Sequence, residues 1–467
     1  MLCKQAPFLY LSDWTDQIVL ITDTIIMRLH LISIGGSVMH NIALDLQKNG
    51  HLISGSDDEI YEPAKSRLAK AGLLPDQIGW VAERITTDLD AVILGMHARA
   101  DNPELERAKE LGIRIFSFPE FIYEHASNKT RIVVAGSHGK TTTTSMIMHA
   151  MKAAGMDFDY LVGGQIEGFD HMVRFSNAPI MVMEGDEYLS SAIDRRPKML
   201  HYKPHFAIIT GIAWDHMNVF PTYQNYKDQF GLFLDTIESG GKVYYFSGDE
   251  DLVEIAAGNQ RKDIEVLPYS FLEDHLMNAM QVFGKHNQAN LMAASLICEQ
   301  IGILPQSFVE SMANFSGTSK RLQKLYESEE LKVFLDFAHA PSKLKATVEA
   351  VRSKYTDYKL IALYELHTYS SLNKEFLQQY KGSMDLADKA LVYFNAHTLE
   401  MKKMPDLSPD FIRDAFQRPD LEVCQDNAAL VHFIQEHKGN RHVFLFMTSG
   451  TFNGLPIFET LNLPKNS

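Results

Sequence analysis

Short apolar runs and longer amphipathic stretches alternate along most of the chain. RLHLISI at 28–34 and RIVVA at 131–135 are two of the runs, and glycine follows each of them. The stretch at 35–50 has apolar positions every three or four residues and ends in glycine. The runs predict buried strands and the stretches predict amphipathic helices. Strands that alternate with helices are typical of parallel sheets covered by helices.

The same pattern predicts strands in every part of the chain. They are expected at HLISGSD (51–57), DAVILGM (90–96), IRIFSF (113–118), IMVME (180–184), FAIIT (206–210), KVYYF (242–246), KVFLDFAH (332–339), KLIALYE (359–365), KALVYF (389–394) and HVFLFM (442–447). Helices are expected between them, for example at NQANLMAASLICEQIG and at PSKLKATVEAVRSK.

Two polar stretches, HASNKT and NFSGTSKR, divide this alternation into three units. We therefore predict an α/β fold with three consecutive domains and largely parallel sheets. The first, 27–127, should be Rossmann-like, the second, 128–318, P-loop ATPase-like, and the third, 319–467, Rossmann-like again. Residues 1–26 do not fit the pattern or the order of a signal peptide, and we treat them as an N-terminal tail.

Composition narrows the function further. The formal net charge is −15 and hydrophobic residues make up 45% of the chain, so it can bury several cores but lacks a broad basic surface for nucleic acid. No run of 18 apolar residues occurs, so no membrane partner is expected. Its cysteines, Cys3, Cys298 and Cys424, form no C-x-x-C pair, which suits a reducing compartment and predicts a cytoplasmic protein.

The clearest candidate for chemistry is the loop GSHGKTT at 136–142, between a predicted strand and a predicted helix. The longer pattern G-x-x-x-x-G-K-[ST] would need glycine at position 134, where this chain has Val134. A threonine-capped turn is the alternative, but the flanking strand and helix favour phosphate binding by the backbone and the lysine. The expected contacts are Gly136, Ser137, His138, Gly139, Lys140, Thr141 and Thr142.

Acidic residues end a neighbouring strand, where a metal that accompanies the phosphate would lie. Glu184 closes the apolar run IMVME, and a carboxylate there is costly without a cation. One Thr141 hydroxyl, one carboxylate and phosphate oxygens suit Mg²⁺. The alternative is that Glu184 is a solvated loop acid with Asp186 and Glu187 beside it. His216 follows another strand, and by itself a structural histidine is the more common interpretation because Mg²⁺ prefers oxygen.

Polar groups in two other stretches could contact a nucleotide. His286, Asn287 and Asn290 open a helix, and amides three positions apart can bind an adenine edge, although capping explains them equally well. In the third unit, Arg321 could reach a γ-phosphate. Asp336 and His339 stand at the carboxyl end of a strand, where α/β proteins place ligand groups, but each could also be structural.

The first unit resembles a dinucleotide-binding site but lacks the complete glycine motif. ISIGGSVMHN has two adjacent glycines but no G-x-G-x-x-G, so NAD is poorly supported and a nucleotide diphosphate fits the turn better. The candidate contacts to such a group are Gly36, Ser37, Met39, Ser56 and Asp57.

Taken in this order, GSHGKTTTT, EGDEY, DHM, GKHNQAN and DFAHAP resemble the motifs of the Mur ligases, and the resemblance covers 27 to about 460. It implies an ATP-dependent ligase that uses Mg²⁺ and binds the UDP of its substrate in the first unit. It makes Lys140, Glu184, His216 and His339 catalytic. It also makes Thr141, Glu184 and His216 metal ligands, and Arg321 and Asp336 ATP contacts.

Within that family, DFAHAP is similar to the branch that acts on UDP-N-acetylmuramate. The stretch EGDEYLSSAIDRRPKMLHYKP and the ending MTSGTFNGL are similar to members that add the tripeptide L-Ala-γ-D-Glu-meso-diaminopimelate through an acyl phosphate. Addition of L-alanine is the alternative, and a P-loop switch, a kinase or a non-catalytic nucleotide-sugar-binding protein are remote ones. The partners expected are small molecules, for a monomer or weak dimer.

The sequence also departs from the family motifs at several positions. Gly185 stands where alanine is usual, Ala340 replaces a second histidine, and Ser33 and His40 replace glycines of the UDP loop. Some Mur ligases carry a carbamylated lysine, but the spacing of Lys227 does not match, and we do not assign it that role.

Overall fold

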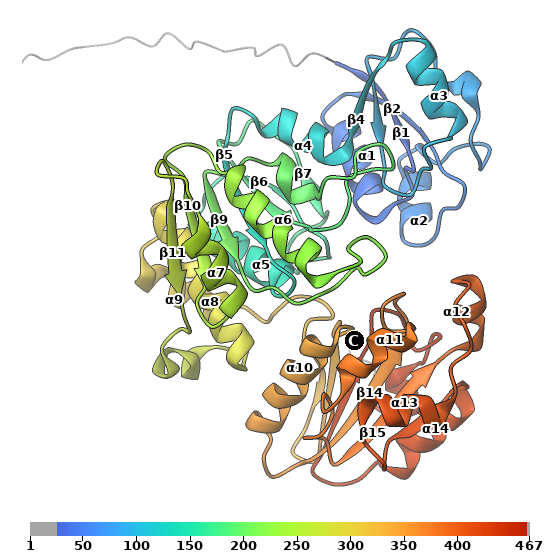
Figure 1. The fold of residues 1–467 in the computed structure, drawn as a ribbon, viewed down its shortest axis with the longest axis vertical. Helices are drawn as coiled ribbons and strands as arrows, with labels where there is room; N and C mark the ends of the chain where they lie inside the picture. The colour runs from blue at the N-terminus through green and yellow to red at the C-terminus, as the bar shows by residue number, and fades with distance from the viewer. Residues whose placement is uncertain (1–25, 465–467) are drawn as a thin grey trace, which may run out of the picture.

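Three sheets follow one another along the chain in a computed structural model that describes residues 26–464 (Figure 1). Of the expected tail at 1–26, all but Ile26 lies outside the described residues. Nearly all neighbouring strands run parallel, so the α/β prediction is confirmed.

The first sheet has the order β2-β1-β3-β4 and is parallel throughout. Its strand β1 ends at Ile32 rather than at residue 34, because Ser33 turns the chain with a φ of 69°. The elements of this unit are β1 (Arg28–Ile32), α1 (Ser37–Lys48), β2 (Leu52–Ser56), α2 (Ala64–Lys70), η1 (Ala82–Arg84), β3 (Ala91–Leu94), α3 (Pro103–Glu110), β4 (Arg114–Ser117) and α4 (Phe118–Ala126).

The second sheet has the order β11-β10-β9-β5-β8-β6-β7, with only β7 antiparallel to its neighbour. Its elements are β5 (Thr130–Ala135), α5 (Lys140–Ala153), β6 (Asp159–Leu161), β7 (Val173–Arg174), β8 (Ile180–Gly185), η2 (Lys198–His201), β9 (Phe206–Ile209), α6 (Tyr223–Asp235), β10 (Lys242–Phe246), α7 (Glu250–Gly258), β11 (Glu265–Tyr269), η3 (Asp274–Ala279), α8 (Lys285–Gln300) and α9 (Pro305–Met312).

The third sheet has the order β12-β13-β17-β14-β15-β16, and its edge strand β12 is antiparallel. Its elements are β12 (Gln323–Glu327), β13 (Leu331–Asp336), α10 (Pro341–Lys354), β14 (Lys359–Leu366), α11 (Lys374–Leu377), η4 (Gln378–Tyr380), β15 (Lys389–Phe394), α12 (Ala396–Met401), α13 (Pro409–Phe416), β16 (Glu422–Cys424), α14 (Asn427–Glu436), β17 (His442–Met447) and α15 (Ile457–Thr460).

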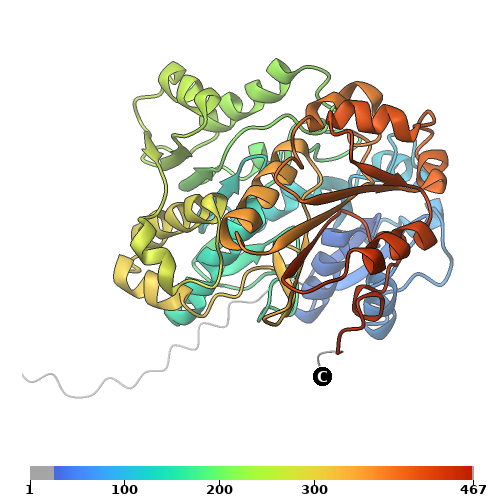
Figure 2. The ribbon, with the colours of Figure 1, turned by 90° about the horizontal axis from the view of Figure 1, so that it is seen from below.

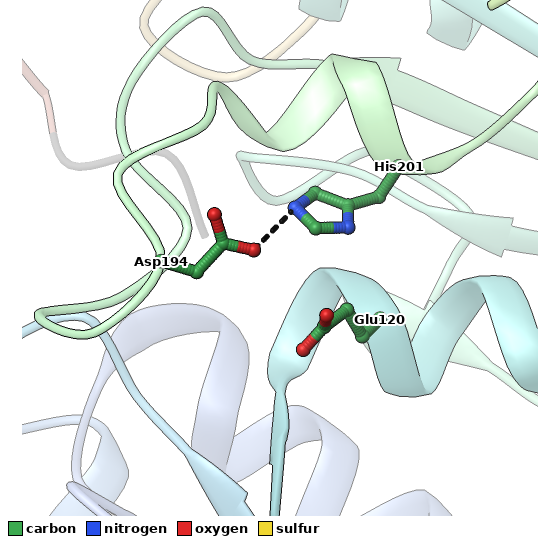
Figure 3. Close-up of side chains that lie close together, drawn as sticks. All are labelled: Glu120, Asp194 and His201. Carbon is green, nitrogen blue, oxygen red and sulfur yellow. Dashed lines mark ion pairs between the residues drawn. The ribbon is translucent and has the colours of Figure 1, made fainter.

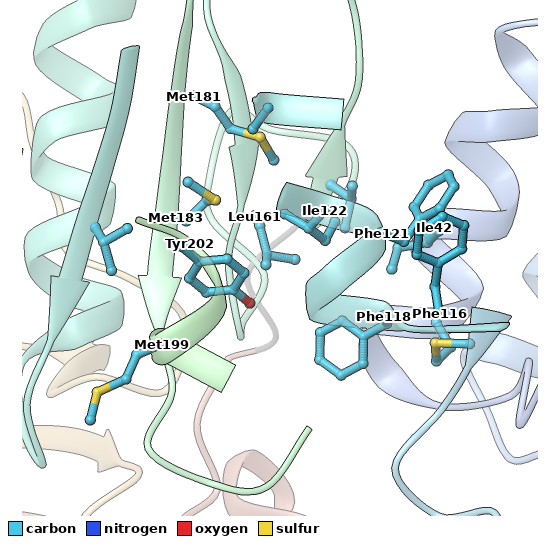
Figure 4. Close-up of a cluster of buried hydrophobic side chains, with 14 of the residues drawn as sticks. Ile42, Phe116, Phe118, Phe121, Ile122, Leu161, Met181, Met183, Met199 and Tyr202 are labelled. Carbon is cyan, nitrogen blue, oxygen red and sulfur yellow. The ribbon is translucent and has the colours of Figure 1, made fainter. Parts of the chain in front are cut away.

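The first two units share one hydrophobic core (Figure 4). Ile42 of α1 and Phe121 of α4 belong to the same buried cluster as Met181 of β8. A hydrogen bond supports this packing, because the side-chain carboxylate of Asp45 accepts the backbone N–H of Phe175 at 2.6 Å. The first unit is therefore fixed against the central sheet by buried apolar surface, the strongest cohesive force available to it.

The third unit has two cores of its own, one on each face of its sheet. Figure 1 shows it as a separate body, coloured orange to red, next to the central unit, and in the view from below it lies in front of the other units (Figure 2). Polar contacts join the two units, among them His138 with Ser342 and Arg321 with Thr141. The carboxyl ends of their strands meet there, so ligand groups from both units can share one site.

No helix among the described residues is long and apolar enough to cross a membrane.

Candidate active site

The phosphate loop is short because its strand is long. Val134, where the longer motif requires glycine, lies inside β5 and is fully buried in the core. The turn starts at Gly136, which has a φ of 119°, and a Cβ there would lie 2.8 Å from the backbone nitrogen of Thr210. Gly139 has a φ of 80° and stands directly before α5. Both glycines are therefore required by the backbone.

The loop is held from behind by a buried hydroxyl pair. Ser137 Oγ lies 2.6 Å from the hydroxyl of Tyr226 and accepts the N–H of Ala213 at 2.9 Å. Thr210 donates its hydroxyl to the carbonyl of His138. These contacts leave the first N–H groups of α5 without side-chain caps, which is the usual arrangement of an anion site at a helix start.

Lys140 lies folded back over this loop. Its ammonium donates to the carbonyl of Gly136 at 2.6 Å and to Glu187 Oε2 at 2.5 Å. Burial alone would lower the pKa of Lys140, but Glu187 and Asp186 outweigh burial and hold the pKa above its ordinary value. Lys140 is therefore a cation held beside the loop, where it could pair with a bound phosphate.

Glu184 is the last residue but one of β8, and only one of its carboxylate oxygens has a hydrogen-bond partner. The N–H of Gly163 donates to Oε2, whereas Oε1 is buried without a hydrogen-bond partner. Burial raises the pKa of Glu184, although the Thr141 hydroxyl and Lys140 oppose this. An orphaned carboxylate oxygen beside a threonine hydroxyl fits a hard cation such as Mg²⁺.

The other expected metal ligand, His216, lies with different acids. Ligand atoms of Asp186, Glu187 and His216 lie within 4.8 Å of one another, and His216 Nε2 is 3.6 Å from Glu187 Oε1. Glu184 is 7% and Glu187 1% exposed, so the alternative of a solvated loop acid at Glu184 is wrong, and Glu187 is buried beside it. Despite burial, Lys140 and His216 hold the pKa of Glu187 below its ordinary value. The run of three acids within EGDE was the signal for this group.

The third unit contributes His339, and with it a lysine that the sequence did not reveal. His339 Nε2 lies 3.6 Å from Asp215 Oδ2, and Lys343 Nζ lies 3.9 Å from the same oxygen. His339 Nδ1 lies 2.9 Å from the carbonyl of Phe337. Burial lowers the pKa of His339, which keeps the imidazole neutral near pH 7.

A cavity of about 330 Å³ lies between the central and third units beside the loop. Asn287 and Asn290 line it from α8, with their amides 3.4 Å apart, so the expected common face is confirmed. Arg321 lies over the ring of Phe337 at 4.6 Å. The Asp336 carboxylate accepts from the N–H of Leu322 and the hydroxyl of Thr347, so it braces the cavity wall. Further lining groups include His138, Gly139, Thr142, His286 and Lys343.

The candidate contacts in the first unit fall into two groups. Gly36 and Ser37 begin α1, and Asp57 accepts the N–H of Gly35 at 2.7 Å, with burial raising its pKa to about 6. Met39 is buried in the core and Ser56 donates its hydroxyl to Glu104. Both side chains therefore have contacts inside the domain, and contact of these residues with UDP stays a prediction.

A second cluster of potential metal ligands lies at the contact between α4 and the segment before η2 (Figure 3). His201 Nε2 is 3.1 Å from Asp194 Oδ2, and Glu120 lies beside them. Arg196 already pairs with both carboxylates, at 2.7 Å from Asp194 and 3.4 Å from Glu120. This cluster is therefore an ion-pair network with its own cation.

A phosphate loop at a helix start, buried acids beside it and ligand groups from a second α/β unit define a nucleotide-dependent enzyme that works between domains. Three family models match consecutive parts of the chain: the Mur ligase family, catalytic domain, at residues 28–130, the Mur ligase middle domain at residues 134–281, and the Mur ligase, glutamate ligase domain at residues 320–450. The chain belongs to the Mur ligase family and is an ATP-dependent ligase.

Similar proteins agree with this assignment. A UDP-N-acetylmuramate–L-alanine ligase of a Sulfurihydrogenibium species is 30% identical over 388 residues, which cover 79% of this chain and 82% of that one. A ligase of the same name from an Arthrobacter species is 28% identical, with 83% and 85% covered. Among solved structures, a murein peptide ligase from Psychrobacter arcticus has a TM-score of 0.65 at 24% identity, covering 94% of this chain and 100% of that one. A UDP-N-acetylmuramate–alanine ligase from Thermotoga maritima has a TM-score of 0.66 at 21%, with 93% and 98% covered.

Membership of a ligase family excludes the remote alternatives of a P-loop switch, a kinase and a non-catalytic nucleotide-sugar-binding protein.

The position of Lys140 predicts its effect on nucleotide binding. Replacement by alanine, K140A, should weaken both ATP and ADP about 10- to 100-fold, because a charged donor to the inner phosphates is lost. Titration calorimetry measures this. The matched control is Lys152→Ala at the far end of α5, where the lysine donates to the carbonyl of Gly168. Unchanged affinities in K140A would contradict the assigned loop.

Proposed function

We propose that the chain joins the lactyl carboxylate of UDP-N-acetylmuramate to the α-amine of L-Ala-γ-D-Glu-meso-diaminopimelate. The observation that carries the reaction type is the cavity between the central and third units, where the phosphate loop meets Arg321. His339 of the third unit lies 3.6 Å from Asp215 of the central unit. A carboxylate is a poor acyl donor in water, so phosphorylation by ATP is the activating step. The residues proposed to contact ATP lie on two domains, so the site can assemble as these domains close around the substrates.

The first step forms an acyl phosphate. A carboxylate oxygen of the muramate attacks the γ-phosphorus of ATP, the bond to the bridging oxygen breaks, and ADP leaves. Lys140 and Arg321 flank the loop from two domains and offset the negative charge that gathers on the phosphoryl oxygens. This step is then catalysed by positioning the reactants and by neutralising the charge on the phosphoryl oxygens.

The second step transfers the acyl group to the amine. The amine nitrogen attacks the carbonyl carbon, inorganic phosphate leaves, and the nitrogen gives up a proton. We assign that proton to His339, because its Nδ1 faces the carbonyl of Phe337 and its Nε2 is directed to the Asp215 side of the site. A neutral imidazole is a competent acceptor at that atom.

Magnesium would be held by Thr141 and Glu184, whose orphaned Oε1 fits a hard cation. A second ion would be held by His216 with Glu187, the residue that the sequence motif alone left aside. Such ions supply charge neutralisation for the phosphates. Because Lys140 and Lys198 pair with Glu187 and Asp186, these acids stay ionised and ready for a cation.

The acceptor is proposed from the segment after Glu184. Its sequence resembles that of tripeptide-adding members, and it borders the site. Lys198 donates to Asp186 at 2.5 Å, and its ammonium lies 5.7 Å from the centre of the Tyr188 ring. Tyr188 in turn packs edge-on against His216, with ring centres 4.8 Å apart. Changes in this segment are therefore transmitted to the reacting groups.

L-Alanine is the second candidate, favoured by a different observation. The similar relatives at 28–30% identity carry the name UDP-N-acetylmuramate–L-alanine ligase. The two candidates share both chemical steps and differ only in the amine.

Phosphate release measured with each amine separately distinguishes them. We expect release to require UDP-N-acetylmuramate together with the tripeptide, and to stay at background with L-alanine, because the amine must be the one that the third unit accepts. Omission of the muramate is the control. Brisk turnover with L-alanine and none with tripeptide would establish the second candidate.

The metal assignment has a separate test. His216→Ala should weaken Mn²⁺ binding to the ADP complex about tenfold or more, because the second ion loses a direct ligand. Electron paramagnetic resonance of Mn²⁺ measures the free ion. His149→Ala serves as the matched control, since His149 lies on α5 with its Nε2 3.1 Å from the carbonyl of Ser311. Equal Mn²⁺ affinity in both variants would refute the role of His216.

A further inference from the structure

Lys343 belongs to the third unit but lines the cavity beside the phosphate loop of the central unit. It stands in the first turn of α10, and its side chain is 17% exposed. The adjacent Ser342 places this turn, because its Oγ lies 2.6 Å from Nε2 of His138, a loop residue. A hydrogen bond between the loop and the helix start therefore sets Lys343 next to the phosphate site.

The charge of Lys343 is incompletely matched. Among the described residues, the one carboxylate that forms an ion pair with its ammonium is Asp215, at 3.9 Å, and His339 lies 3.6 Å from that same oxygen; Glu187 acts on it from farther away. Lys140, by contrast, has Glu187 at 2.5 Å. Burial, with the nearby cations Lys140 and Arg321, lowers the pKa of Lys343 to about 8 even though Asp215 opposes this. A largely buried cation with a distant partner is stabilised by an incoming anion.

The place of Lys343 indicates which anion group it meets. Lys140 and the start of α5 are positioned for the inner phosphates. Lys343 lies on the side of Asp215, the residue before His216, where the carboxylate and the phosphoryl group that reacts must come together. Its side chain therefore points to the outer end of the triphosphate.

We propose that Lys343 is a catalytic cation that the third unit supplies to the terminal phosphoryl group of ATP. This inference rests on the proposed function, in which ATP occupies this cavity. It gives the contact between the central and third units a chemical role, because only a docked third unit brings the ammonium to the loop. It also gives the site a means to distinguish ATP from ADP, since the outer phosphoryl group alone reaches Lys343.

The test compares two nucleotides rather than activity alone. The full chain and its Lys343→Met variant are titrated by calorimetry with the β,γ-imido analogue of ATP and with ADP, each with Mg²⁺. We expect the analogue to bind about 10- to 100-fold more weakly to the variant, because a charged contact is lost. ADP should bind within about twofold of its wild-type affinity, because it lacks the group that Lys343 contacts.

Lys345→Met is the matched control, since Lys345 lies on the same helix with its side chain 64% exposed. Both nucleotides should bind this variant normally. Lys343→Arg should recover part of the affinity for the ATP analogue. Thermal melting reports whether Lys343→Met disturbs folding; if it does, Lys343→Gln replaces it and should weaken the analogue in the same way.

Equal weakening of ADP and the analogue would overturn the inference, because it would mean that Lys343 only supports the cavity wall. Unchanged affinity for both nucleotides would overturn it as well. If the wild-type chain bound neither nucleotide, the proposed function would fail and this inference would fail with it.

Discussion

The buried ion pair between Lys140 and Glu187 is the interaction on which the site depends. The two charged groups lie 2.5 Å apart, and Glu187 is almost fully enclosed. Removing either partner would leave an uncompensated charge in a poorly solvated place, which is costly. The pair joins the phosphate loop after β5 to the acids after β8, so it sets the distance between the phosphate and metal positions.

The other two domains are attached to this central site in different ways. The first is fixed to the central sheet by a shared hydrophobic core. The third is joined by polar contacts, including His138 with Ser342. It carries Arg321 and Asp336, which line the cavity beside the loop, and these groups reach the loop only where the third unit touches it. A shared core fixes the first domain, whereas the third has its own cores and meets the central unit through polar contacts and the apolar side chains Met217 and Phe283.

Much of this arrangement was accessible from the sequence because local patterns report local structure. Strand–helix alternation predicted the three sheets, and G-x-x-G-K-T predicted a loop that Val134 does not disturb because it belongs to β5. Short or polar edge strands such as β7 and β12 were missed, since neither has an apolar run long enough to distinguish it from a loop.

The remaining site residues depend on partners far away in the chain. Glu187 looks solvated until Lys140 and His216 cover it, and Lys343 looks like an ordinary helix lysine until the central unit is placed against it. Met39 follows the apolar period of α1 and is buried in the core. The surroundings of these residues were misjudged for one reason: a local sequence pattern does not show burial by a segment that is distant in the chain.

The central claim is that this site activates a carboxylate as an acyl phosphate, and an isotope measurement tests it most directly. UDP-N-acetylmuramate labelled with ¹⁸O in both carboxylate oxygens is turned over with ATP and the amine, and the released phosphate is analysed by mass spectrometry. One ¹⁸O atom in each phosphate is the expected result, since the attacking carboxylate oxygen leaves with phosphorus. Phosphate without the label would contradict the account, because the carboxylate would then have been activated by some other route.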